Sequence, residues 1–231
     1  MKKVLYILTL LFFLAACNQN SSTTDVQKVD AISDTLTKDR NEHIEREIVN
    51  DSLVLYSDSL YRNLELHFTA ISKNEFQSYK QNYKAECALD SGNFISGSDL
   101  YVSHHCNEIC ETYLAERSSN RKLLMPSDYD AGIVTMQLSP SCDQLLICSS
   151  YDGPDFKDYY ENRAEIFVFK VNKGTGLKVI VPAFKYDTKK WSIEDLTWVD
   201  TKTIALKIYE EARWGDGSGV HYNYYKTKLS K

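Results

Sequence analysis

Hydrophobic positions early in the chain follow two different periods. Apolar residues first recur three or four positions apart, at Val49, Leu53, Tyr56, Leu60 and Leu64. This spacing predicts an amphipathic helix. Between residues 64 and 70 apolar and polar residues alternate, which predicts a strand because successive side chains of a strand point to opposite faces. Ser72 and Glu75 match a capping box and predict a short helix after it, so the segment 45–91 is predicted to be helix, strand, helix.

Beyond residue 92 the pattern changes to short runs of β-branched and aromatic residues. The predicted strands cover residues 99–103, 110–116, 133–138, 144–149, 164–171, 177–184, 203–210 and 220–229. Turn-forming Gly, Pro, Asp and Asn residues separate these runs, and no useful stretch of helical periodicity interrupts them. The predicted fold class is therefore mainly β: an antiparallel meander over residues 92–231 with a small N-terminal α/β segment.

A weak internal repeat with an offset of 58 residues runs through the predicted β domain. The stretch 138–145 aligns with 196–203, and the stretch 164–171 aligns with 222–229. Each unit contains a turn, a strand, a long polar loop and a second strand. Units of this kind bury a face only by stacking on their neighbours.

The turn at the start of this repeat resembles a known family. Residues 139–146, SPSCDQLL, resemble the Ser-Pro-Asp-Gly-Lys-x-Leu turn and strand of TolB-like β-propeller blades, and residues 198–205, WVDTKTIA, are similar. Ser141 and Cys142 replace the family's Asp and Gly. The likeness covers about residues 97–231, which suffices for about three blades, whereas a closed propeller usually has at least four. The resemblance implies an open, propeller-like meander that binds proteins or peptides through exposed loops.

Residues 1–16 have the pattern of a secretory signal peptide. Lys2 and Lys3 precede an apolar run of about 11 residues, which is too short to span a hydrocarbon core of about 30 Å as a helix. The tetrapeptide LAAC, which ends at Cys17, resembles the lipobox of bacterial lipoproteins. That resemblance implies removal of the leader, acylation of Cys17 and anchoring of the mature chain in a membrane. An ordinary secretory signal with an incidental cysteine is the alternative.

The residues that follow the lipobox suggest where the chain is anchored. Residue 18 is Asn, whereas an Asp there retains many such lipoproteins at the inner membrane, so the resemblance favours the outer membrane of the cell envelope. Residues 18–40 are polar and lack sustained periodicity. A lipidated flexible tether is therefore predicted over residues 17–44. Which face of the membrane the folded part occupies is left open.

Composition narrows the class of protein. The chain has 231 residues, of which 43% are hydrophobic and 26% charged, enough to bury the core of one globular domain with appendages. The 16 tyrosines favour a β-rich structure. A net charge of −5 lacks the basic footprint that a nucleic-acid-binding protein requires, so no nucleic-acid partner is predicted.

The sharpest cluster of chemically active side chains is the segment 104–110, HHCNEIC. Its imidazoles and thiols could ligate zinc or copper, and the candidate ligands are His104, His105, Cys106 and Cys110. However, C-x₃-C matches no standard zinc motif, and a strand would point adjacent histidines to opposite faces. A turn with paired or buried cysteines is favoured, and no cofactor is predicted. A metal-assisted or thiol-dependent envelope enzyme centred on this cluster is the alternative function.

Five cysteines follow Cys17: Cys87, Cys106, Cys110, Cys142 and Cys148. An exported protein meets an oxidising compartment, where disulfide pairs are expected. Because the number is odd, one thiol must stay unpaired within the monomer. The spacing does not determine which cysteines pair.

Two loops have the composition of recognition surfaces, where rigid aromatic rings supply contact area at low entropic cost. In loop 151–163 the candidate binding residues are Tyr151, Asp152, Asp155, Tyr159, Tyr160 and Arg163. Loop 212–219 adds Trp214 and Asp216. Solvated hairpin loops are the alternative. The predicted function is non-enzymatic: a lipid-anchored module that binds a protein, peptide or other ligand through these loops. An envelope self-protection protein of the immunity type is a further alternative.

Overall fold

A computed structural model describes residues 46–50, 53–87, 94–127, 129, 132–153, 156–211 and 219–229. The protein is mainly β, as predicted, and the described residues belong to one compact unit, His43–Lys231. The predicted division between residues 45–91 and 92–231 therefore does not separate two compact units. The predicted signal peptide, Cys17 and the predicted tether lie outside the described residues. No described helix has the length and apolar character needed to cross a membrane.

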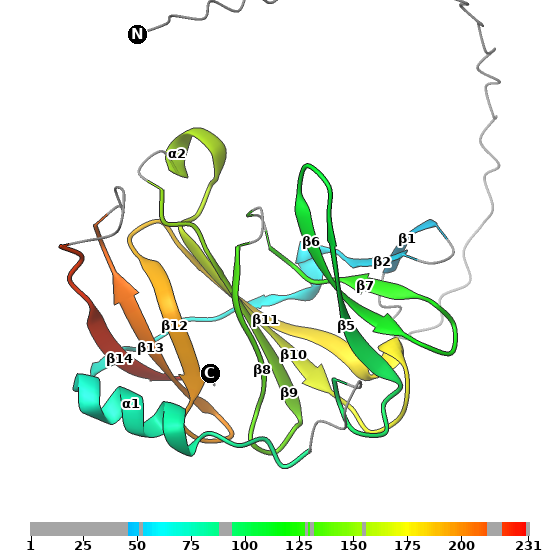
Figure 1. The fold of residues 1–231 in the computed structure, drawn as a ribbon, viewed down its shortest axis with the longest axis horizontal. Helices are drawn as coiled ribbons and strands as arrows, with labels where there is room; N and C mark the ends of the chain where they lie inside the picture. The colour runs from blue at the N-terminus through cyan, green and yellow to red at the C-terminus, as the bar shows by residue number, and fades with distance from the viewer. Residues whose placement is uncertain are drawn as a thin grey trace, which may run out of the picture. The chain divides into compact units, whose positions relative to one another are not determined.

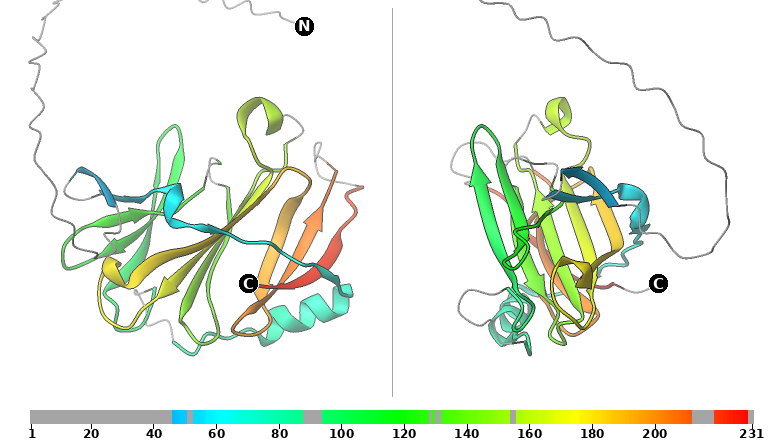
Figure 2. Two further views of the ribbon diagram at one scale, coloured as in Figure 1. Left: turned by 180° about the vertical axis from the view of Figure 1, so that it is seen from behind. Right: turned by 90° about the vertical axis from the view of Figure 1, so that its right-hand side faces the viewer.

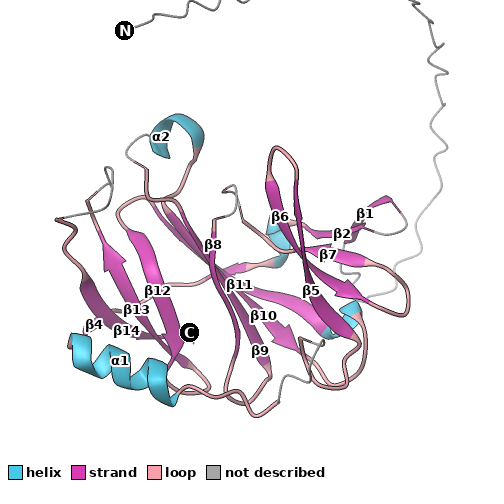
Figure 3. Ribbon diagram, in the orientation of Figure 1, coloured by secondary structure: helices cyan, strands magenta, loops and turns pink. Residues whose placement is uncertain are grey.

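The strands form three sheets, drawn in Figures 1 and 3. Sheet A consists, in spatial order, of β1 (Arg46–Asn50), β2 (Leu53–Tyr56), β7 (Lys122–Leu124), β6 (Cys110–Glu116) and β5 (Leu100–Cys106). Sheet B consists of β3 (Arg62–Asn63), β11 (Ile180–Thr188), β10 (Ala164–Val171), β9 (Gln144–Ser150) and β8 (Ile133–Leu138). Sheet C consists of β12 (Ser192–Trp198), β13 (Thr203–Tyr209), β14 (Asn223–Lys228) and β4 (Thr69–Ala70). Neighbouring strands are antiparallel except β2 with β7 and β11 with β3.

Short helices complete the described structure: η1 (Asp58–Leu60), α1 (Lys73–Asn82), α2 (Phe156–Tyr159) and η2 (Leu177–Val179). Helix α1 packs against sheet C through Phe76, which is fully buried and lies 5.5 Å from Tyr224 between ring centroids. Figure 1 shows α1 and α2 at opposite ends of the sheets. Loop 151–163, which contains α2, is therefore far from α1.

Sheet B lies between the other two sheets and is covered on both faces (Figure 1). One face contributes Leu145, Ile147, Phe167 and Phe169 to a core shared with sheet A. The other face contributes Leu146, Cys148, Ile166 and Val168 to a core shared with sheet C. Because side chains alternate between the two cores, β9 and β10 have nearly unbroken hydrophobic sequences.

Residues 53–70, which we call the strap, contribute a strand to each of the three sheets (Figure 2). Strand β2 belongs to sheet A, β3 pairs with β11 of sheet B, and β4 pairs with β14 of sheet C. The Tyr56 hydroxyl donates to the Ile180 carbonyl at 2.6 Å, and the Leu64 N–H donates to the Lys185 carbonyl at 2.8 Å. The ring of Tyr61 meets those of Phe167 and Phe169 edge-on. The strap thus ties the three sheets together along one side.

The predicted helix over Val49–Leu64 is wrong, because this stretch forms β1, β2, η1 and β3. Its apolar residues serve two different cores: Val54 and Tyr61 pack between sheets A and B, whereas Leu64 packs between sheets B and C. Pairing with distant strands thus overrides the local periodicity. The predicted strand over residues 64–70 is reduced to β4, a two-residue strand.

The predicted helix after Ser72 is confirmed as α1. The Ser72 hydroxyl accepts a hydrogen bond from the Glu75 N–H at 3.1 Å, as an N-cap should. The Glu75 carboxylate does not complete the capping box in the way the sequence predicts. It accepts from the Tyr79 hydroxyl at 2.6 Å and from Lys226 at 3.2 Å, and so links α1 to sheet C.

Strands predicted at residues 110–116, 133–138 and 164–171 are confirmed with the same bounds. The sequence analysis missed β7, which has three residues, and β12. In β12 the register with β13 shifts between Ile193 and Asp195. Such an irregularity breaks the alternation by which a strand is recognised in a sequence.

The internal repeat corresponds to the same local order of strands in sheets B and C, β8–β9–β10 and β12–β13–β14. The Ser139 N–H donates to the Gln144 carbonyl, and the Val199 N–H donates to the Thr203 carbonyl, both at 2.8 Å. Cys142 has a φ of 60°, in the left-handed region that favours the glycine of the propeller-blade turn. The likeness of these units to propeller blades stays a prediction.

Candidate functional site

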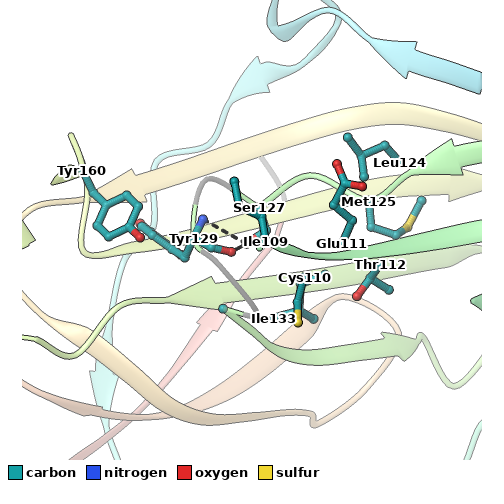
Figure 4. Close-up of a pocket in the computed structure, with 11 residues that line it drawn as sticks. Ile109, Cys110, Glu111, Thr112, Leu124, Met125, Ser127, Tyr129, Ile133 and Tyr160 are labelled. Carbon is teal, nitrogen blue, oxygen red and sulfur yellow. Dashed lines mark hydrogen bonds between the residues drawn. The ribbon is translucent and has the colours of Figure 1, made fainter. Parts of the chain in front are cut away.

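A hollow of about 250 Å³ opens where the ends of sheets A and B meet, and we call it the A/B pocket (Figure 4). Its lining combines residues at the start of β6 and the end of β7 with the segment between β7 and β8, the start of β8 and the residue after α2. Met125 and Tyr129 are almost fully buried there, whereas Ile109 is 64% exposed. Figure 4 shows Tyr160 and Tyr129 toward one end of the pocket and Glu111 and Leu124 toward the other.

Four tyrosines lie together at the aromatic end of the A/B pocket. The ring centroids of Tyr129 and Tyr160 are 5.0 Å apart, and those of Tyr151 and Tyr160 are 4.7 Å apart. Tyr159 lies 6.3 Å from Tyr160 by the same measure and is 71% exposed. The base of loop 151–163 is held by the hydrogen bond from the Tyr151 N–H to the Arg163 carbonyl at 2.9 Å.

The sequence analysis missed Tyr129. It follows the short strand β7 and lies between the polar residues Asp128 and Asp130, a pattern that predicts only a loop. Its ring is 3% exposed because Tyr151 and Tyr160, which come from a loop later in the chain, pack against it. An aromatic residue in a polar segment was the one sign in the sequence that this position could belong to a site. Its contacts with Tyr151 and Tyr160 could not be predicted, because they depend on how sheets A and B pack.

Exposed apolar side chains mark the mouth of this pocket. Among the described residues, the large hydrophobic side chains that are exposed are Ile109, Val134 and Tyr159. Ile109 lines the pocket, and Tyr159 contacts Tyr160. Val134 follows the pocket residue Ile133 at an irregularity in the pairing of β8 with β9, and it is not part of the pocket lining. Exposed apolar groups beside a hollow are typical of contact sites for a partner.

The predicted metal ligands lie at the end of the β5–β6 hairpin but do not form a ligand set. Cys106 and Cys110 face each other across the hairpin and form a disulfide, so neither is available as a thiolate. His104 and His105 are adjacent in a strand and therefore point to opposite faces. Within the described part of the chain, no three His, Cys, Asp or Glu side chains are grouped so as to hold a metal ion.

The structure also assigns the other three cysteines, whose pairing the sequence left open. Cys87, which follows α1, forms a disulfide with Cys142 in the turn between β8 and β9. Cys148 is a free thiol, fully buried in the core between sheets B and C. Its burial, with a smaller effect of Asp195 and Glu165, raises the pKa of this thiol far above its ordinary value. A thiolate nucleophile is therefore not expected at Cys148.

Arg163, a predicted binding residue, is instead buried at 5% exposure. Its guanidinium donates to the carbonyls of Glu210 at 2.5 Å, Glu211 at 3.4 Å and Lys190 at 3.4 Å. Burial lowers the pKa of this guanidinium from its ordinary value, although not into a range where it loses its charge at neutral pH. Arg163 therefore joins the end of β13 to the turn between β11 and β12, which is a structural role.

The other predicted binding residues divide into two groups. Tyr151, Asp152, Tyr159 and Tyr160 are at least partly accessible in loop 151–163. Asp155, Trp214 and Asp216 lie outside the described residues. The structure also brings together two regions that the sequence analysis treated as rival sites, because Cys110 of the hairpin and Tyr160 of the loop line the same pocket.

Glu111 supplies a carboxylate to the lining of the A/B pocket. The hydroxyl of Tyr113 donates a hydrogen bond to this carboxylate. That bond, followed by burial, raises the pKa of Tyr113 to about 12. The Glu111 side chain is thus anchored beside the pocket.

Comparisons of the chain with protein-family models, with curated proteins and with solved structures found no match. The chemistry of the A/B pocket must therefore be argued from its own residues. Apolar and aromatic side chains provide most of its surface, with one carboxylate and the hydroxyls of Thr112 and Ser127. This combination suits the binding of an amphipathic group.

Proposed function

We propose that this protein is a lipid-anchored, non-enzymatic module of the cell envelope that binds a partner polypeptide at the A/B pocket. The observation that carries the proposal is the presence of two highly exposed apolar side chains at that pocket: Ile109 lines it, and the ring of Tyr159 contacts the lining residue Tyr160. Covering such side chains with a partner gives about 1.5–3 kcal/mol each. Pockets surrounded by aromatic residues are also where binding hot spots cluster.

The anchoring half of the proposal rests on the N-terminal sequence. The tetrapeptide LAAC resembles a lipobox, and Asn18 favours the outer membrane. The two disulfides support an oxidising compartment, because such bonds rarely persist in the cytosol. Mass spectrometry of the N-terminal peptide tests this half: we expect Cys17 to be the first residue and to carry acyl chains. An unmodified Cys17 thiol in the membrane-purified protein would contradict it.

The internal repeat supports a further part of the proposal, namely that sheets B and C are related, blade-like units in an open arrangement. Their equal strand order is what the resemblance to propeller blades implies. In such an arrangement, loops at the ends of the sheets are the binding elements. The A/B pocket lies at such an end.

The binding half is tested by cross-linking in the native membrane, followed by purification through the anchored protein. We expect a reproducible partner in near-equal amount with the unaltered chain, and its loss when Ile109→Ser and Tyr159→Ser are combined. The matched control is Val134→Ser, which removes an exposed apolar side chain that is not part of the pocket lining. Retention of the partner by the double variant, or equal loss with the control, would contradict the proposal.

A further inference from the structure

Acidic side chains gather around the A/B pocket. Glu111 lines it, Glu108 precedes the exposed Ile109, and loop 151–163 adds Asp152, Asp158 and Glu161. The described basic side chains of the hairpin 104–110 and loop 151–163 are Lys157, His104, His105 and the buried Arg163, which donates to backbone carbonyls and interacts electrostatically with Asp152. In the neighbouring strand β7, Lys122 lies over the ring of Tyr113, which binds Glu111.

The adjoining segments do not reverse this excess of negative charge. Lys189 and Lys190, in the turn between β11 and β12, are matched in number by Glu210 and Glu211 after β13. The ion pair between Lys189 and Glu161 is 3.5 Å long and solvent-exposed, so it is weak. The mouth of the A/B pocket therefore presents a negative field to an approaching partner.

The size of the pocket suggests what enters it. Sites for drug-sized ligands and cofactors are about 300–1,000 Å³, whereas the A/B pocket is about 250 Å³. A single long side chain of a polypeptide suits this smaller volume. The aromatic end and the carboxylate end of the pocket shown in Figure 4 require that side chain to be apolar along its stem and charged at its tip.

We propose that the partner inserts a cationic side chain, arginine or lysine, into the A/B pocket; this inference rests on the function proposed above. The aliphatic stem would pass the rings of Tyr160 and Tyr129 and pack on Met125. The tip would reach the carboxylate of Glu111. A carboxylate has two oxygens that can accept several hydrogen bonds, so the bond from Tyr113 does not exhaust Glu111.

A lysine or arginine side chain matches the A/B pocket both in its apolar stem and in its charged head. Lysine and arginine bury their alkyl stems on apolar surface while the charged head keeps polar partners. Aromatic faces attract such cations as well. A neutral apolar side chain would leave the Glu111 carboxylate covered without a cationic partner, which is unfavourable. The surrounding acidic side chains would speed the approach of a basic segment in a salt-dependent way.

The test uses the whole protein, isotope-labelled, and two short peptides, acetyl-Gly-Leu-Arg-Leu-Gly-amide and the same peptide with citrulline in place of arginine. Citrulline keeps the shape of arginine but carries no charge. By nuclear magnetic resonance titration at low salt, we expect the arginine peptide to shift the signals of Ile109 and Ile133 and to bind about tenfold more tightly than the citrulline peptide. Adding salt should weaken the binding of the arginine peptide.

Two variants test whether the preference for the arginine peptide over the citrulline peptide depends on Glu111. Glu111→Gln keeps an acceptor for Tyr113 and should remove most of the tenfold preference for arginine. Glu86→Gln, which removes an equal charge from an exposed site outside the pocket lining, is the matched control and should leave the preference intact. Equal reduction of the preference by both variants would overturn the role of Glu111.

Two results would overturn the cationic occupant. If the two peptides bind equally well, the pocket remains a docking site but does not select a cation. If neither peptide shifts the pocket signals, the cationic occupant is also rejected, while the capture experiment with the double variant still decides the proposed function separately.

Discussion

The Arg163 guanidinium carries a buried charge whose hydrogen-bond partners are backbone carbonyls far away in the sequence. It donates to the carbonyls of Lys190, Glu210 and Glu211 and interacts electrostatically with Asp152 of the same loop. In the sequence it stands among tyrosines and acidic residues, where a solvent-exposed binding arginine would look the same. Its role follows only from the way β13 ends beside the turn between β11 and β12.

Removal of this side chain is expected to destabilise the fold. Arg163→Ala should lower the free energy of unfolding by about 2–4 kcal/mol, because it deletes the charge-assisted hydrogen bonds that a buried side chain makes to three backbone carbonyls. Arg163→Lys should recover only part of the loss, since an ammonium lacks the planar fork of the guanidinium. Urea denaturation measures both variants. The control Lys157→Ala removes an exposed positive charge, and a loss as large as that of Arg163→Ala would refute this role.

In the turns before β9 and β13, an aspartate carboxylate accepts hydrogen bonds from nearby residues and so fixes where the next strand begins. Asp143 accepts from the Ser141 and Ser139 hydroxyls at 2.6 and 2.8 Å. Asp200 accepts from the Lys202 and Thr203 N–H groups at 2.7 and 2.8 Å. Burial alone would raise the pKa of each carboxyl, but these hydrogen bonds together outweigh it, so both pKa values lie below the ordinary range. Both turns therefore favour the ionised form.

These two carboxyls should make the fold sensitive to acid. A carboxyl whose pKa is lower in the folded chain stabilises it fully above the unfolded value of about 4, and loses this effect as the pH falls through the folded value. The double variant Asp143→Asn, Asp200→Asn should therefore show a shallower decline of unfolding free energy between about pH 5 and pH 2. Urea denaturation across that range measures it. A decline as steep as that of the unaltered chain would contradict the assignment.

The strap shows why one element was predicted wrongly. Of its residues at helical spacing, Tyr56 packs against the core between sheets A and B and Leu64 lies in the core between sheets B and C, whereas the buried Val54 and Tyr61 are not part of the helical spacing. A periodicity argument assumes one buried face. Strands β9 and β10 of sheet B were predicted well for the complementary reason, since each is a short, nearly unbroken apolar run bounded by turns.

Tyr61 is the residue of the strap on which its stability should depend most directly. It is 9% exposed, with ring centroids 5.3 Å from Phe167 and 5.6 Å from Phe169. Tyr61→Ala should cost about 3–5 kcal/mol of unfolding free energy, as other large-to-small aromatic changes in cores do. Tyr159→Ala makes the same change at an exposed site and should stay within about 0.5 kcal/mol. Similar losses for the two variants would show that the strap is not part of the core.

At the scale of the whole molecule, the sequence predicted the β class and the candidate loop but not the site. The hairpin 104–110 and loop 151–163 meet at the A/B pocket only because sheets A and B pack with their ends aligned. No local pattern encodes that packing. The sequence therefore suggested two rival functions, metal chemistry at the hairpin and recognition at the loop, whereas in the structure Cys110 of the hairpin and Tyr160 of the loop line the same pocket and Cys110 is held in a disulfide.

The central claim, that a partner binds at the A/B pocket, is tested most directly by a photo-cross-linking amino acid placed at position 159. Illumination in the native membrane should give one discrete adduct, because the Tyr159 side chain is exposed at the mouth of the pocket. The same amino acid at position 82, in the exposed end of α1 at the opposite end of the sheets, should give none (Figure 1). An absent adduct at position 159, or the same adduct from both positions, would contradict the account.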